Sequence, residues 1–411
     1  MADVSSRPGC RLKPIRALRL LLSSLPAVML LTACLAKEAQ ALPSMLRVQI
    51  FEMSKDLAEV DIDGPCELLS PISKDFGRSS RMNVINRKGK LAVTFISSHK
   101  PPRSHDRMAR ASKGSGDAPS LINAERFILA ASSRDGVGIT VGRNHRRYRG
   151  RLVFTAINKG MRITNEVSGR DYVMSVVGSE APPHCPSEAL KAFAVLSLMI
   201  VDRKPDGDTI GDSTKEQCYK GADYATPEVE RAVSSMFKKR LYWNGSLIRP
   251  YFHSTCAGGT SDGVSIFGND AKGLDYLKHV KCTYCTQSPF WKKKTSNLSA
   301  VKLKQILASQ TVPLIDERDQ TGRPVSLVLS GDRHISGYEA WIKIGRSQGW
   351  DLVPGTRYDI AAPDGQGSIK ITSSGAGHGV GLCQWGAVGL ARLGKSADDI
   401  LTFYFPKTKL K

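Results

Sequence analysis

Short runs in which apolar and polar residues alternate fill much of the chain between residues 45 and 164. Such alternation is typical of strands that bury one face. Turns at Gly64-Pro65 and Lys88-Gly89 separate the first of these runs. The pattern predicts strands within residues 45–60, 91–96, 127–131, 137–141, 152–157 and 161–164. The chain is therefore expected to begin with a region rich in β-structure.

The spacing of apolar residues becomes helical at Gly169. A helix over residues 169–179 gathers Val173, Val176 and Val177 on one face. The same three-and-four spacing brings Glu180 onto this apolar stripe. We therefore expect Glu180 to point toward the protein interior and not toward water.

Prolines separate this helix from a second one. Ala181-Pro182-Pro183 ends the first helix, because proline lacks a backbone donor and disfavours helical geometry in the residue before it. The second helix starts at Pro186, a favoured first position, and is apolar on nearly every side from residue 192 to 201. This second helix should be buried.

The second half of the chain mixes both periodicities. We predict helices over residues 227–237 and 298–309, a hairpin with Asn244-Gly245 as its turn, a series of strands through residues 325–371, and a last helix whose capping box runs from Ser396 to Asp399. The predicted fold class is α+β, with many strands around the two central helices.

Glu180 is the first candidate for catalysis. A carboxyl group at a helix end against buried apolar surface should have a raised pKa and stay protonated near neutrality, as a general acid must. The alternative is a structural acid paired with an arginine such as Arg170. Spacing alone favours the structural acid.

The glycines from Gly375 to Gly381 alternate with other residues, so the backbone there can approach a ligand or a neighbouring strand closely. This pattern is expected to expose His378, and its spacing matches no phosphate-binding loop. The alternative is a glycine-rich hairpin with a solvated histidine. Gln384 and Trp385, just beyond, are suited to a sugar site, one for hydroxyl groups and one as a stacking platform.

The cysteines offer a candidate metal site. Cys282 and Cys285 form a CxxC pair, which is half of a zinc site, and Cys256 could supply a third sulfur. The fourth ligand could then be His253, His279 or Cys218. A disulfide between two of these cysteines is the alternative, and it is about as probable in an oxidising compartment.

The first 41 residues have the features of an export signal. Basic residues precede an apolar run from Leu20 to Leu31, which is too short for a comfortable membrane span. The lipobox-like sequence ending at Cys34 would place a lipid on that residue, whereas Ala39-Gln40-Ala41 offers a second cleavage site. We expect an exported, periplasmic lipoprotein anchored to the membrane through Cys34; a signal anchor that is never cut is the alternative.

The formal net charge of the chain is +21. In an exported protein this charge favours an anionic polymer at the cell surface as partner, and binding of nucleic acid is a rival that depends on charge alone. Part of the excess lies in residues 99–121, which are basic and rich in glycine and serine. We interpret this stretch as a flexible insertion.

Three segments resemble a known family, the stage II sporulation protein D (SpoIID) family of peptidoglycan lytic transglycosylases. They are DYVMSVVGSEAPPHCPSEALKAFAV, YFHSTCAGGTSDG and GHGVGLCQWGAVGLARLGKSADDILTFYFPKTKL, with weaker similarity in YRGRLVFTAINKGMRITNEVSGRDY. The likeness spans residues 45–411, with the basic insertion as a gap. It implies one SpoIID-like catalytic domain, β-rich, whose central helices carry the catalytic glutamate.

The resemblance implies an enzyme that cuts the MurNAc–GlcNAc linkage of glycan strands lacking stem peptides and leaves 1,6-anhydroMurNAc ends. Glu180 matches the family's catalytic glutamate, and His253, His378, Gln384 and Trp385 are expected to bind the substrate. No cofactor is required. The family's zinc site uses a Cys/His set after the long helix, where this chain has only Glu216-Gln217-Cys218-Tyr219, so zinc would need Cys256, Cys282 and Cys285.

A second hypothesis is a non-catalytic protein that binds denuded glycan and recruits or activates an amidase. Amidases or division proteins are the partners expected in that case, within cell-wall remodelling or division. Its groove would be intact without any need for Glu180.

Overall fold

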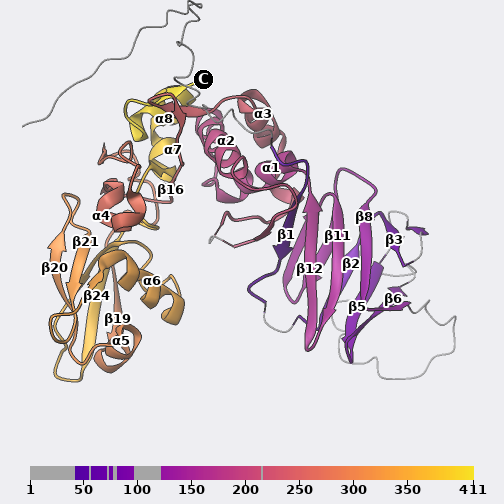
Figure 1. The fold of residues 1–411 in the computed structure, drawn as a ribbon, viewed down its shortest axis with the longest axis horizontal. Coiled ribbons are helices and arrows are strands. Elements are labelled where there is room, and N and C mark those ends of the chain that lie inside the picture. Colours follow the sequence, from indigo (N-terminus) through magenta and orange to yellow (C-terminus); the bar gives the residue numbers. More distant parts are fainter. Residues whose placement is uncertain (1–41, 55–56, 72–73, 77–80, 97–121, 214–215) are drawn as a thin grey trace, which may run out of the picture. The chain divides into compact units, whose positions relative to one another are not determined.

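The computed structural model describes residues 42–411 except 55–56, 72–73, 77–80, 97–121 and 214–215 (Figure 1). The predicted signal peptide with Cys34 and the predicted basic insertion at residues 99–121 lie outside the described residues. No helix in the described ranges combines the length and the apolar character that crossing a bilayer demands.

The N-terminal region consists of two mainly antiparallel sheets, whose strands are drawn in indigo to magenta in Figure 1. The first has the order β13 (Thr209–Gly211), β1 (Leu46–Ile50), β12 (Gly160–Val167), β11 (Arg151–Ile157), β8 (Arg126–Ala131), β3 (Cys66–Ser70) and β4 (Lys74–Phe76). The second has the order β10 (Asn144–Tyr148), β9 (Val137–Val141), β2 (Glu59–Asp63), β5 (Arg81–Arg87), β6 (Lys90–Ile96) and β7 (Ile122–Ala124). The β-rich start predicted from alternation is confirmed.

Helices α1 (Gly169–Glu180) and α2 (Ser187–Val201) follow directly after β12. The Ser168 hydroxyl caps α1 by accepting a hydrogen bond from the Asp171 N–H, and α1 ends at Glu180, as the prolines predict. Helix α2 begins at Ser187, one residue later than expected, with Pro186 at the N-cap. Its apolar segment is buried, which confirms the prediction from hydrophobicity.

Within the described residues, the remaining elements form small sheets and six further α-helices. The sheets join β14 (Leu241–Trp243), β15 (Ser246–Leu247) and β26 (Lys409–Leu410); β16 (Phe252–His253) and β25 (Leu382–Cys383); β17 (Gly258–Gly259) and β18 (Lys281–Cys282); β19 (Lys294–Ser299), β24 (Ser368–Ser374) and β23 (Arg357–Ile360); and β20 (Leu314–Arg318), β21 (Pro324–Val328) and β22 (His334–Ser336). The helices are α3 (Pro227–Met236), α4 (Gly263–Phe267), α5 (Ala300–Leu307), α6 (Gly337–Gln348), α7 (Gln384–Arg392) and α8 (Ala397–Tyr404).

Helix α6 corrects the expectation that residues 325–371 are all strands. Ser336 caps α6 by accepting from the Glu339 N–H, and Ala340, Trp341 and Ile344 form its buried face. Glycine at position 337 is required by packing, because a Cβ atom there would lie 2.0 Å from the Pro324 carbonyl oxygen. Helices α3 and α5, the Asn244-Gly245 turn and the capping box of α8 all confirm the corresponding predictions.

All described residues belong to one compact unit with two hydrophobic cores. The larger core contains α2, which contacts α1, α3, α7 and α8. At the end of α2, Asp202 forms a buried ion pair with Arg240, whose Nη2 lies 3.1 Å from Asp202 Oδ1. The pair therefore joins α2 to the strand β14 that follows.

Removing one partner of this pair should be costly. Asp202→Ala would leave the buried Arg240 guanidinium uncompensated, so we expect the free energy of unfolding to fall by about 3–5 kcal/mol. Glu228→Ala removes the partner of Arg231 in an exposed ion pair and should cost less than about 1 kcal/mol. Urea titration of both variants measures the difference, and equal losses would contradict a structural role for the buried pair.

Candidate functional site

Glu180 is the last residue of α1, and its side chain is half-buried. Its Oε1 accepts a hydrogen bond from the backbone N–H of Cys218 at 2.8 Å, and its Oε2 accepts one from Gln384 Nε2 at 3.3 Å. Three segments that are far apart in the sequence thus meet at one carboxylate group. Each carboxylate oxygen therefore accepts one hydrogen bond from an uncharged donor.

The loop that carries Cys218 is held by its neighbour Tyr219, which is fully buried. The Tyr219 hydroxyl donates to Asn165 Oδ1 at 2.5 Å, and its ring stacks on Tyr172 of α1 with centroids 5.1 Å apart. Farther along, the Gly221 N–H donates to the hydroxyl oxygen of Ser175 at 2.9 Å. These contacts fix the Cys218 N–H relative to the helix that ends in Glu180.

Gln384 is held by the start of α7. It is buried, and the preceding residue, Cys383, is the N-cap of that helix. Cys383 also pairs with His253 through the parallel strands β25 and β16. The backbone before and after Gln384 is therefore fixed, which restricts the position of its carboxamide group.

Arg170 does not pair with Glu180. Its Nη2 donates to the Ser234 hydroxyl oxygen at 2.6 Å, and its guanidinium lies over the Phe237 ring. Among the residues described, no lysine, arginine or histidine forms an ion pair with Glu180. The alternative of a structural acid paired with Arg170 therefore has no support in these contacts.

His378 lies within the glycine-rich loop and bonds to backbone through both ring nitrogens. His378 Nδ1 accepts from the Val380 N–H at 3.2 Å, so Nε2 carries the proton and donates to the Phe252 carbonyl at 2.7 Å. Burial lowers the pKa of His378 to about 4. The glycine pattern does not expose this ring as expected: it is half-buried, because both nitrogens bond to backbone.

His253 lies beside His378, with ring centroids 5.5 Å apart. Its Nδ1 donates to the Val380 carbonyl at 3.1 Å, and burial lowers its pKa well below the usual value. Its Nε2 is buried and has no hydrogen-bond partner in the described part of the chain. Both histidines thus brace the loop against the segment that carries β16.

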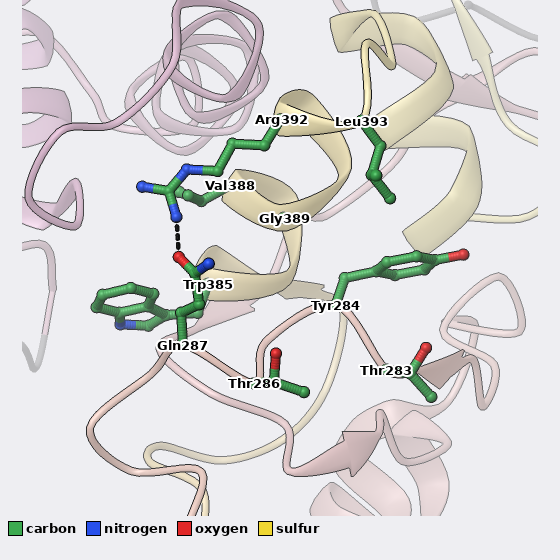
Figure 2. A pocket seen from close by; sticks show the side chains of 9 residues that line it. All are labelled: Thr283, Tyr284, Thr286, Gln287, Trp385, Val388, Gly389, Arg392 and Leu393. Carbon is green, nitrogen blue, oxygen red and sulfur yellow. Dashed lines mark hydrogen bonds between the residues drawn. The ribbon is translucent and has the colours of Figure 1, made fainter.

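Trp385, the neighbour of Gln384, is half-buried and lines a surface cavity of about 250 Å³ (Figure 2). Figure 2 shows its indole beside Gln287 and Arg392, which hydrogen-bond to each other. The cavity is lined by Thr283, Tyr284, Thr286, Gln287, Trp385, Val388, Gly389, Arg392 and Leu393. It combines aromatic surface with hydroxyl, amide and guanidinium groups, whereas Glu180 is not part of its wall.

The cysteines Cys256, Cys282 and Cys285 come together as the spacing predicts, and a fourth cysteine, Cys383, joins them. All four are buried, and their Sγ atoms lie within 4.8 Å of one another. The fourth side chain of this group is therefore Cys383, and His253, His279 and Cys218, which were suggested as a fourth ligand, are not part of it. His279 instead has its Nδ1 2.7 Å from the Thr260 carbonyl oxygen.

At the family's expected zinc position, residues 216–219 do not fit a metal. Glu216 pairs with Lys204 at 2.6 Å, and Tyr219 is buried against Asn165. The described ligand-type side chains that gather as a metal-sized group are the four cysteines.

Two contributors to the site escaped the sequence analysis. The Cys218 N–H is a backbone group, so no residue type reveals it. Cys383, by contrast, has a signal in the sequence, because it directly precedes Gln384 in the glycine-rich motif, but it lies far along the chain from the CxxC pair.

Comparison with known proteins finds sequence similarity over the segment that contains α1, α2 and the loop after them. The sequence model of the family described as Stage II sporulation protein, SpoIID, matches residues 157–242. An uncharacterized protein of Brachyspira hyodysenteriae is 32% identical over 277 residues, which cover 63% of this chain and 70% of that protein. Stage II sporulation protein D of Bacillus subtilis is 28% identical over 265 residues, 58% of this chain and 73% of its own length.

A third relative, the amidase enhancer of Bacillus subtilis, is 26% identical over 281 residues, which cover 57% of this chain and 39% of that protein. Glu180 lies within the segment that the family model matches, residues 157–242, and the protein has an α+β fold. The chain belongs to the SpoIID family. Membership of this family indicates a role related to the cell wall.

The low pKa of His378 predicts that acid weakens the fold. The unfolded histidine takes up a proton below about pH 6.5, whereas folded His378 stays neutral to about pH 4. The unfolded state then binds more protons in this window, so the free energy of unfolding falls as the pH falls. His378→Gln keeps one donor and one acceptor, and we expect it to lose less stability than the wild type between about pH 7 and about pH 4.5.

Urea titrations at the two pH values measure the losses. His253 contributes in the same direction but is present in both proteins, so the comparison isolates His378. Equal losses in the two proteins would show that His378 titrates normally.

Proposed function

We propose that this protein is a peptidoglycan lytic transglycosylase that cleaves the MurNAc–GlcNAc linkage of glycan strands lacking stem peptides. The observation that carries the proposal is the setting of Glu180, a half-buried carboxylate with one neutral N–H donor on each oxygen. Among the described residues, no cation forms an ion pair with this carboxylate. The family membership supports the choice of substrate.

Glu180 acts twice in the proposed reaction. As an acid, it gives its proton to the glycosidic oxygen, so that the bond from C1 of MurNAc to that oxygen breaks. As a carboxylate, it takes the proton of the MurNAc 6-hydroxyl while that oxygen bonds to C1 and closes the 1,6-anhydro ring. The substrate supplies the nucleophile, so no second carboxylate is needed, unlike in hydrolases with paired carboxylates.

The two donors assign different roles to the carboxylate oxygens. The Cys218 N–H can only donate, so Oε1 stays an acceptor throughout. The Gln384 carboxamide can donate to a carboxylate through Nε2 or, turned over, accept from a protonated acid through its oxygen. Oε2 is therefore the oxygen that carries the proton in this proposal. The Gln384 carboxamide turns over when the protonation state of Oε2 changes.

The cavity beside Trp385 gives a candidate subsite for the glycan. Its aromatic face suits a sugar ring, and the hydroxyl and amide groups of Thr283, Thr286 and Gln287 suit sugar hydroxyls. Arg392 suits the lactyl carboxylate that MurNAc exposes once its stem peptide is removed. In this proposal His253 and His378 act by supporting the loop that leads to Gln384.

The proposal includes export, since the substrate lies outside the cytoplasm. Residues 1–41 would direct the chain to the periplasm, and lipid on Cys34 would hold it at the membrane. The net charge of +21 would favour contact with an anionic glycan.

A second candidate function is favoured by one observation, the similarity to the protein named amidase enhancer. In that case the chain would bind denuded glycan without cutting it and would recruit or activate an amidase. Glu180 would then be dispensable.

Glu180→Gln distinguishes the two candidates, because the amide keeps the size of the side chain and removes the acid. We expect the yield of anhydro-ended fragments from denuded peptidoglycan, measured by mass spectrometry, to fall about 100-fold or more. Glu228→Gln, on the exposed face of α3, is the control and should cut like the wild type.

Fragments with reducing ends in place of anhydro ends would identify a hydrolase and contradict the transglycosylase. Glycan binding by wild type and Glu180→Gln, without cleavage by either beside a working control enzyme, would support the amidase-linked candidate.

A further inference from the structure

We propose that Cys256, Cys282, Cys285 and Cys383 hold one structural Zn²⁺ ion as a tetrathiolate site, which fixes the start of α7. The four side chains come from three distant parts of the chain: the segment before β17, the CxxC pair at β18, and β25. This inference concerns a metal site that touches no substrate in the proposed glycan chemistry.

The separation of the sulfur atoms fits a single metal ion. Four thiolates around Zn²⁺ at about 2.3 Å place their sulfurs about 3.8 Å apart at the corners of a tetrahedron. Here all four Sγ atoms lie within 4.8 Å of one another, and Cys256 and Cys285 are 3.5 Å apart. A disulfide would need an S–S distance of about 2.05 Å, and an iron–sulfur cluster would need room for several irons and sulfides between the thiolates.

Hydrogen-bond donors are directed at these sulfurs. The backbone N–H groups of Cys256 and Gly386 each lie 3.3 Å from Cys383 Sγ. The hydroxyl of Tyr404, which is fully buried, lies 3.1 Å from Cys282 Sγ. Donors of this kind stabilise thiolates and orient metal ligands, so the surroundings suit deprotonated sulfur.

A buried cation supports the charge of such a site. Zn²⁺ with four thiolates carries a net charge of −2, which is costly to bury without compensation. Arg323 is 1% exposed, and its Nη2 donates to the Cys256 carbonyl oxygen at 2.7 Å. In the described part of the chain no carboxylate forms an ion pair with its guanidinium, although the nearby Asp319 carboxylate interacts favourably with it, and the metal-thiolate group would add further negative charge.

The packing around the sulfurs leaves no room for a larger residue at the start of α7. A Cβ atom at Gly386 would lie 2.7 Å from Cys282 Sγ and 2.0 Å from the Tyr404 hydroxyl oxygen. The helix backbone therefore sits directly on the sulfur cluster. This contact is what allows a bound ion to set the position of α7.

The site reaches Glu180 through one residue. Cys383 directly precedes Gln384, whose Nε2 bonds to Glu180 Oε2. Zinc bound to Cys383 would thus hold the Gln384 carboxamide in place relative to α1. Cys383 is a positioning residue in this account and touches no substrate.

The experiment measures metal in the full chain, purified without metal-affinity resin. Native mass spectrometry and elemental analysis should find about one zinc ion per chain in the wild type. Cys383→Ser should lose most of this zinc. Cys66→Ser is the matched control, because Cys66 is an equally buried free thiol in β3, and it should keep the ion.

A readout on the wild type keeps the test valid if Cys383→Ser fails to fold. Cobalt replacement should give the visible absorption of tetrahedral Co²⁺ bound to thiolates, and alkylation without reductant should find no disulfide among the four cysteines. Iron in place of zinc, disulfides between these cysteines, or a metal-free wild type that takes up no added zinc would each overturn the proposal.

The zinc content of the protein does not depend on whether Glu180 is catalytic. Glu180→Gln should bind zinc like the wild type, so failure of the metal site and failure of the transglycosylase proposal give different results.

Discussion

The burial of α2 is the constraint on which the rest of the structure depends. From residue 192 to 201 this helix has almost no polar side, so other elements must cover it all round. Helices α1 and α3 cover it from the N-terminal part of the chain, and α7 and α8 from the C-terminal part. A hydrophobic requirement of one helix thereby brings Glu180, at the end of α1, to Gln384, at the start of α7.

Glu180 forms no ion pair with a cation in the described part of the chain. Both of its partners are neutral donors, in contrast to the arginines that pair with acids elsewhere in the fold, such as Arg240 with Asp202. In the described part of the chain, the arginines that form ion pairs form them with other acids.

The sequence analysis was most successful where local periodicity determines structure. The strands around β11 and β12, the break at Pro182-Pro183 and the capping box of α8 were all predicted, because each depends on neighbours within a few residues. Helix α6 was missed because its glycine at position 337 weakens the helical pattern, and the reason for that glycine is a contact with Pro324.

The candidate site was predicted only in part for the same physical reason. Glu180, Gln384 and the four clustered cysteines all lie in segments that carry signals of their own, but no signal in the sequence joins Cys383 to the other three cysteines. The Cys218 N–H and the Cys383 thiol take their places through tertiary packing. The satisfied nitrogens of His378 likewise follow from the backbone of Phe252 and Val380, which no spacing within the glycine motif reveals.

The hydrogen bond from Gln384 to Glu180 spans 204 residues of sequence, and this has a consequence for the timing of activity. The N-terminal sheets and α1 precede the Gln384 segment in the chain, so they are synthesised before it. A nascent chain therefore carries Glu180 before it carries the residue that donates to Oε2. The hydrogen-bonded setting of Glu180 is complete only once the Gln384 segment has been made and has packed against α1.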